Sequence, residues 1–290
     1  MNSTVFLGLV THQGTSYPES RGPTGLVRSV QAALGELHIP TIVSIHDENL
    51  HDDTVVPVTN KEVKASIDAE LDVEQRWRLH VDPDQSHLRL SAFMAARKLY
   101  RRIRLTPPWH HSTEATPQGA RMLRRLVNIE FAHLNLMQEA VDCRSTWALI
   151  VEDDARVADS QGFAEALEAF MKNKTTTDQP RYVNVSQSFA DPLGISTHLA
   201  PIGAWDAATA VMAADRALTN TVCAVLYRTP FLEALLSTLR EIPVSPVLPI
   251  DWKLNEALLA LTGRGTISPG DCWFLTPGPI TQGSMHGVTS

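Results

Sequence analysis

The sequence predicts an α/β protein in which a mixed, mainly parallel sheet is flanked by helices. Short apolar runs that suit buried strands occur at residues 4–11, 41–46 and 147–151. The segments that precede the second and third runs carry apolar residues at helical spacing. Hydrophobic residues make up 43% of the 290 residues, which is enough to bury a large core. No linker between two domains is evident, so we expect a single domain.

The first predicted unit is a strand, a loop, a helix and a second strand. The strand at residues 4–11 leads into a loop rich in turn-forming residues, 12–23. A helix is predicted to begin near Thr24, as N-cap, and to end at about Gly35, before the strand at 41–46. Such a unit forms a right-handed crossover between parallel strands. The loop after the first strand and the acids after the second should therefore face a common ligand.

The middle of the chain predicts helices over residues 61–72 and 90–104. The second helix mixes five basic residues with apolar ones, so it suits peripheral contact with a membrane surface or with an anionic acceptor such as a lipid-linked glycan. The alternative is a helix packed by its apolar side, with its arginines in water or paired with acids. The loop at 106–112, which holds His110 and His111, is expected to be a turn or a lid and not a metal site.

Three consecutive acids, Glu152, Asp153 and Asp154, follow a predicted helix over residues 119–141 and the apolar run at 147–151. Side chains alternate along a strand, so Glu152 and Asp154 should project to one side and Asp153 to the other. Two converging carboxylates are costly unless a cation joins them, and hard oxygen ligands suit Mg²⁺ or Mn²⁺. Because such an ion leaves positions for substrate phosphates, the pattern predicts a metal-bridged diphosphate, such as a nucleotide-sugar. The alternative is a solvated acidic turn.

Four blocks of sequence resemble the family 25 glycosyltransferases, the lipooligosaccharide galactosyltransferase type, which have the GT-A fold. The first block joins residues 131–142, which include His133, to residues 148–155, which hold the acids. The family has Ser where this chain has Ala132, and an aromatic residue where it has Met137. The other blocks follow in the family's order, at residues 221–231, 247–254 and 273–284.

The resemblance implies a nucleotide-binding part over residues 1–155 and an acceptor part over 156–290. It implies a nucleotide-sugar donor, with a UDP-sugar favoured, and a glycan or glycolipid acceptor. Arg21 would reach a phosphate, although an ordinary surface arginine in a flexible loop is the alternative. The remaining donor-binding candidates are Thr11, His12, Gln13, Asp47, His133, Glu152 and Asp153.

The same resemblance assigns the metal and the chemistry. Asp154 would bind Mn²⁺ or Mg²⁺, with Glu152 assisting and His286 as a third ligand. The cation would neutralise the diphosphate leaving group. Asp251, at the start of a predicted helix whose amide dipoles stabilise a carboxylate, would deprotonate the acceptor hydroxyl, and direct displacement would invert the anomeric centre. Helix capping by Asp251 is the alternative, or an additional, role.

Composition bears on which ligands and which cellular location we expect for this protein. A net charge of −7 argues against nonspecific binding of nucleic acid. Three widely spaced cysteines suit reduced thiols, and no apolar stretch approaches a membrane span, so we expect a cytoplasmic protein, with the inner face of the membrane as an alternative location. A strand is expected at 181–186, and a loop at 192–206 in which Trp205 and Asp206 are able to contact a sugar. Two alternatives stay open: another metal-dependent phosphate-ester enzyme, such as a nucleotidyltransferase or phosphohydrolase, and a catalytically silent nucleotide-sugar binding protein.

Overall fold

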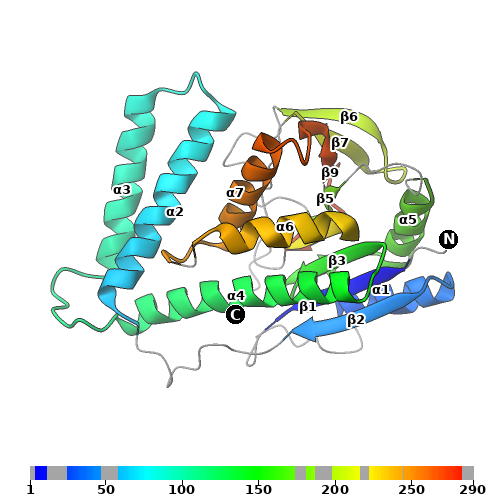
Figure 1. Cartoon of the computed structure of the whole chain (residues 1–290), viewed down its shortest axis with the longest axis horizontal. Helices are drawn as coiled ribbons and strands as arrows, with labels where there is room; N and C mark the ends of the chain where they lie inside the picture. Colours follow the sequence, from blue (N-terminus) through cyan, green and yellow to red (C-terminus); the bar gives the residue numbers. More distant parts are fainter. Residues whose placement is uncertain are drawn as a thin grey trace.

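The computed structural model of the chain describes residues 4–11, 25–46, 58–173, 181–186, 198–215, 222–243 and 245–282. Within these ranges an eight-stranded sheet lies between helices (Figure 1). The strands are β1 (Val5–Val10), β2 (Thr41–His46), β3 (Trp147–Glu152), β4 (Ala155–Val157), β5 (Tyr182–Asn184), β6 (Leu199–Ala204), β7 (Ala210–Ala214), β8 (Ala224–Arg228), β9 (Cys272–Thr276) and β10 (Ile280–Gln282). The helices are α1 (Leu26–Glu36), α2 (Asn60–Val81), α3 (His87–Leu105), α4 (Pro117–Asp142), α5 (Ser160–Asn173), α6 (Thr229–Glu241), α7 (Ile250–Gly263) and the short 3₁₀ helix η3 (Pro269–Asp271).

The large sheet has the strand order β2-β1-β3-β8-β5-β9-β7-β6. Strands β2, β1 and β3 are parallel to one another, and β5 is parallel to β9. Strand β8 runs antiparallel to both β3 and β5, and the edge pair β7 and β6 is antiparallel. The expected α/β class and mixed sheet are therefore confirmed. Strands from both halves of the sequence lie in the one sheet, and β4 pairs separately with β10.

The two faces of the sheet are buried by different helices because side chains alternate along each strand. In β1, Val5, Leu7 and Leu9 pack in a cluster with α1 and α5. Phe6 and Val10 point the other way, into a cluster with α4, α6 and α7. Burying one such side chain stabilises the fold by roughly 1.5–3 kcal/mol. The apolar run of β1 therefore serves both cores.

Helix α4 confirms the helix that the sequence predicts before the acids. The Thr116 side chain accepts a hydrogen bond from the amide of Gly119 at 3.1 Å, and Pro117 occupies the first turn, where its missing amide hydrogen does no harm. Leu136 and Ala140 on the inner face are fully buried against the sheet. The helix thus fixes the start of β3, and with it the place where the acids follow.

Helices α2 and α3 form a hairpin at one end of the molecule, on the side toward which the β2 arrow points (Figure 1). Helix α3 meets the alternative of packing by its apolar side in part: Leu90 and Met94 pack against α2 and the arginines pair with acids, but most of its apolar residues do not pack. Arg97, Arg101 and Arg102 face α2, where they pair with Glu74, Glu70 and Asp68. The reason is that α2 presents a row of acids toward α3. Most of the apolar residues of α3 consequently point outward.

Residues 199–204 differ from the expected loop, because they form strand β6 at the edge of the sheet. Pairing with β7 overrides the turn-forming residues, and the register shift between Pro201 and Gly203 accommodates them. Trp205 is 6% exposed and packs on Phe163 and Phe170, with ring centroids 5.8 and 5.0 Å apart. Its ring is therefore a core element and is not available to a sugar. Among the helices that the structure describes, none combines the length and the apolarity needed to cross a membrane.

Candidate active site

The candidate site lies where the parallel strands β1 and β3 end. Thr11 follows β1, and the acids follow β3, so both reach the same edge of the sheet. Because β8 is antiparallel to β3, its first residues lie at this edge too. The start of α7 adds Asp251, whose titration responds to the charge of Glu152. The ends of β1 and β3 and the start of β8, which are distant in sequence, therefore meet in one region, and the charge of Glu152 reaches Asp251.

The centre of this region is a cluster of Glu152, Asp154 and Cys223. One ligand atom from each side chain lies within 4.8 Å of the other two. Strand β3 ends at Glu152, and Asp153 and Asp154 form the turn into β4, so a turn and not a continuous strand brings the two carboxylates together. Asp154 is 8% exposed. Two such carboxylates repel each other unless a proton or a cation joins them.

Asp153 points away from the cluster. Its Oδ2 accepts a hydrogen bond from Oγ1 of Thr11 at 3.2 Å. Thr11 is itself buried, with 4% exposure. The bond ties the end of β1 to the turn after β3, so Asp153 and Thr11 hold the edge of the sheet together. The turn, and not alternation along a strand, separates the three acids: Glu152 and Asp154 converge, and Asp153 bonds to Thr11.

Cys223 is a member of the cluster that sequence reasoning missed. The amide of Glu152 donates to the carbonyl of Cys223 at 2.8 Å, which sets the two residues side by side. The thiol Sγ lies 3.8 Å from Oδ1 of Asp154. Burial raises the pKa of the Cys223 thiol well above its usual value, and the negative charges of Glu152 and Asp154 raise it further. The signal that would have placed Cys223 here is the antiparallel pairing of β8 with β3, which spacing within one segment does not reveal.

His133 supports the cluster from α4. Its side chain is 1% exposed, and Nε2 lies 3.5 Å from Oε1 of Glu152. Neither ring nitrogen makes a hydrogen bond to another described residue. Burial leaves the ring little surface for a donor nucleotide, whereas its approach to Glu152 allows it to orient that carboxylate.

Asp251 is the second residue of α7, and Pro249 occupies the N-cap position, so capping by Asp251 itself is not observed. Desolvation by burial raises the pKa of Asp251 to about 7. The backbone amide of Trp252 lowers the pKa, but the charges of Glu152 and Glu70 raise it. The sequence argument expected the helix dipole to stabilise the carboxylate, and burial outweighs that effect.

Several candidates lie outside the described residues: His12, Gln13, Arg21, Asp47 and His286. Strand β10 pairs with β4 so that Gln282 faces Ala155, the neighbour of Asp154, and the end of β10 therefore lies beside the acidic turn.

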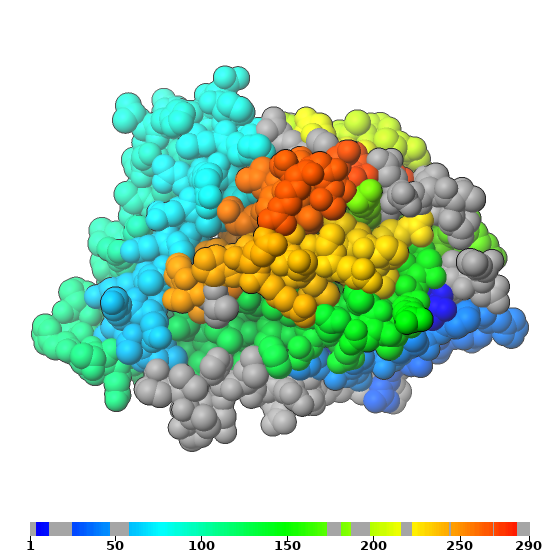
Figure 2. Space-filling model, in the orientation of Figure 1, coloured from blue at the N-terminus to red at the C-terminus, as the bar shows by residue number. Residues whose placement is uncertain are grey.

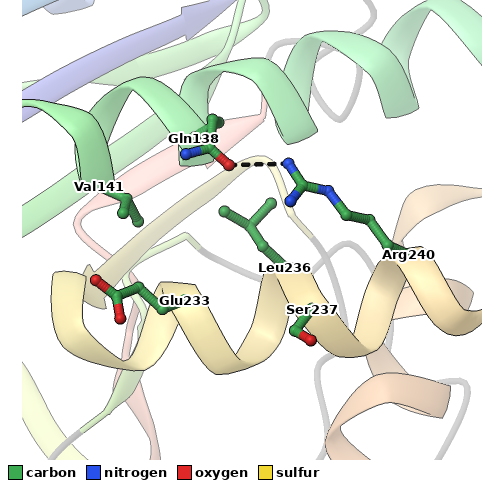
Figure 3. A pocket seen from close by; sticks show the side chains of 6 residues that line it. All are labelled: Gln138, Val141, Glu233, Leu236, Ser237 and Arg240. Carbon is green, nitrogen blue, oxygen red and sulfur yellow. Dashed lines mark hydrogen bonds between the residues drawn. The ribbon is translucent and has the colours of Figure 1, made fainter.

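A groove of about 300 Å³ lies elsewhere, between α4 and α6. Figure 3 shows Arg240 spanning it, with Nη2 donating to Oε1 of Gln138 at 2.8 Å. Gln138 belongs to the end of α4 that leads into the start of β3, whereas the acids follow the end of that strand. The groove contains none of the predicted site residues; its lining is Gln138, Val141, Glu233, Leu236, Ser237 and Arg240.

Comparison with known proteins adds no assignment. No model of a protein family matches the chain, and no curated protein matches it significantly. Function has to be argued from the geometry and chemistry of the site.

Proposed function

We propose that this protein is a metal-dependent glycosyltransferase of the GT-A type, which moves a sugar from a nucleotide-sugar, with UDP-sugars favoured, to a glycan or glycolipid acceptor. The observation that carries the proposal is the convergence of Glu152 and Asp154 at the carboxyl edge of the sheet, where β1 and β3 end together. Open α/β sheets bind ligands at this edge. The resemblance of the surrounding residues to the family 25 motifs adds the reaction class.

The donor set fits Mn²⁺ or Mg²⁺. Glu152 and Asp154 offer hard carboxylate oxygens within 4.8 Å of each other, a spacing that one cation can bridge. A thiol is a soft ligand, so for a hard cation the two carboxylates are the ligands that we assign. A cation bound there would stabilise the negative charge of the leaving diphosphate.

Asp251 is the residue that we assign as general base. A base works best when its pKa lies near the working pH, and the pKa of Asp251 is about 7. At neutral pH the carboxylate form is thus well populated, yet it accepts a proton readily. Deprotonation of the acceptor hydroxyl by Asp251, with attack from the side opposite the diphosphate, inverts the anomeric centre.

His133 and Thr11 are positioning residues in this proposal. His133 lies against Glu152, and Thr11 holds Asp153, so each restrains one of the three acids. Restraint matters because misplacement of a ligand by about 1 Å weakens catalysis strongly. Replacement of either residue should weaken metal binding without removing a ligand.

A transfer assay tests the proposal. Purified protein is incubated with a panel of nucleotide-sugars, Mn²⁺ and glycan acceptors, and the free nucleoside diphosphate is measured. We expect release that requires both the metal and an acceptor, with the sugar recovered on that acceptor. Asp251→Asn should lower kcat at least about 100-fold while donor binding persists. Glu36→Gln, an exposed acid at the end of α1, is the matched control and should leave activity unchanged.

Two results would contradict the proposal. Release of nucleoside diphosphate that needs no acceptor, with no sugar transferred, would indicate a phosphohydrolase. An Asp251→Asn variant with the kcat of the unaltered protein would show that Asp251 is not the base.

The alternative of a two-metal phosphohydrolase has less support in the structure. Hydrolysis with two metal ions needs further carboxylates, and within the described residues a single group of three ligand-type side chains lies this close together.

A further inference from the structure

The outer face of α3 is an apolar surface that no described element covers. Exposed fractions reach 85% at Leu88, 61% at Leu99 and 64% at Tyr100. The spacing places these residues on one side of the helix, together with small exposed residues such as Ala92 and Ala96. A monomer rarely leaves such a stripe in water without a use for it. The large apolar residues of this outer face are Leu88, Leu99, Tyr100 and Ile103. Phe93 lies at its edge, where Arg78 of α2 and Arg97 face its ring, and Trp109, 69% exposed, follows in the next loop.

The opposite side of α3 packs against α2. Leu90 and Met94 are buried against α2, and the arginines on that side pair with acids of α2. The hairpin forms one end of the molecule (Figures 1 and 2). The ion pairs of the basic side fix α3 against α2, and the apolar stripe on the other side of the helix therefore faces outward.

The charge of this end differs in sign from that of the rest. Residues 60–125 contain 13 Lys and Arg against 8 Asp and Glu, a net charge of +5. The described residues outside this range carry 9 Lys and Arg against 17 Asp and Glu, a net charge of −8. Arg89 and Arg104 are exposed and form no ion pair within the described residues. The molecule is thus strongly polarised, with its apolar stripe at the positive end.

The uneven distribution of charge distinguishes two partners that could cover the apolar stripe, a second copy of the chain and an anionic lipid surface. A second copy of the chain would bring two positive ends together, which charge repulsion opposes. An anionic lipid surface attracts the positive end and repels the negative remainder, so it also orients the molecule. Aromatic and aliphatic side chains between arginines are the composition of helices that lie in a membrane interface.

We propose that the outer face of α3, with Trp109, docks this protein on the surface of an anionic membrane. The helix lies in the plane of the interface and does not cross it. The inference stands apart from the proposed function, since neither the acids nor a sugar donor enters it. It gives the hairpin a role that packing alone does not explain, because packing would turn the apolar side inward.

Vesicle binding tests this proposal. Sedimentation of the full chain is measured with vesicles of phosphatidylcholine alone and with vesicles in which about 30% of the lipid is the anionic phosphatidylglycerol. We expect binding to the anionic vesicles only, weakening as salt is raised. Leu99→Ser with Ile103→Ser should lower the partition coefficient at least about tenfold. Arg89→Gln with Arg104→Gln should lower it by about fivefold for each charge that lies near the surface.

The matched control is Ile202→Ser with Leu259→Ser, which removes two exposed apolar residues outside the hairpin and should leave binding unchanged. All substituted residues are exposed, and circular dichroism checks that each variant is folded. Equal binding to neutral vesicles, no binding to either vesicle, or unchanged binding of the Leu99 and Ile103 variant would overturn the proposal. A dimer in light scattering that dissociates in that variant would overturn it too, since a second copy would then occupy the face.

Discussion

Asp154 and Asp153 are adjacent in sequence but have separate surroundings, and this separation gives a prediction at the residue scale. Asp154 converges with Glu152, whereas Asp153 bonds to Thr11. Asp154→Asn keeps the shape and removes the charge, so we expect transfer to fall at least about 100-fold in folded protein. Asp153→Asn should lower it less, because the amide oxygen still accepts from Thr11. Kinetic assays at saturating Mn²⁺ check the order, and a greater loss with Asp153→Asn would show that the faces are assigned wrongly.

Asp251 gives a pH-dependent prediction for the metal-free protein. Its pKa is raised to about 7, so between pH 4 and pH 7 the native state binds more protons than the unfolded state. Its contribution to the free energy of unfolding is therefore present at low pH and is lost as the pH rises through about 7. The free energy of unfolding of Asp251→Asn, taken relative to that of the unaltered protein, should rise by about 1–3 kcal/mol from pH 5 to pH 8. Urea denaturation at the two pH values measures this, and equal differences at both would contradict it.

At the residue scale the sequence identifies the acidic residues of the candidate site, but not the residues that surround them. The convergence of Glu152 and Asp154 follows from a buried strand that ends in acids. Cys223 could not be placed, because its neighbour across the sheet, Glu152, is 71 residues away in sequence. The raised pKa of Asp251 depends on burial and on the charge of Glu70, which only the packed helices bring near.

A buried ion pair joins two elements that frame the site. Nζ of Lys253, on α7, lies 2.7 Å from both carboxylate oxygens of Glu130, on α4, and the Lys253 side chain is 2% exposed. Lys253→Met leaves the Glu130 charge without its partner, and we expect a loss of about 3–5 kcal/mol in the free energy of unfolding. The double variant Lys253→Met with Glu130→Leu should recover much of that loss. Urea denaturation of both variants decides; a double variant as unstable as the single one would contradict the role assigned to the charge.

Strongly periodic elements are predicted well, and elements fixed by distant partners are not. Helix α4 matches the pattern at 119–141 because its apolar stripe faces the sheet. Helix α3 was expected to pack by its apolar side or to lie on a membrane, and the acids of α2 determined which side packs. Strand β6 was missed because Pro201 and Gly203 indicate a loop, while the pairing with β7 that overrides them is not local.

At the scale of the whole molecule, the α/β class could be predicted, and the order of strands could not. The parallel block β2-β1-β3 follows from the first crossover and from the acidic strand. The insertion of β8 between β3 and β5, and of β9 beside β5, joins segments far apart in sequence. That insertion brings Cys223 to the acids. The candidate site is therefore only partly encoded by local pattern.

The most direct test of the central claim is the thermal stability of the protein with a nucleoside diphosphate, in Mn²⁺ and in excess EDTA. A ligand that binds only the native state raises Tm, and at about 100 times Kd the gain is about 2.7 kcal/mol, or roughly 5 °C. We expect UDP to raise the Tm in Mn²⁺, to leave it unchanged in EDTA, and to have little effect on Asp154→Asn under either condition. Equal stabilisation by UDP in Mn²⁺ and in EDTA would contradict a metal-bridged diphosphate at Glu152 and Asp154.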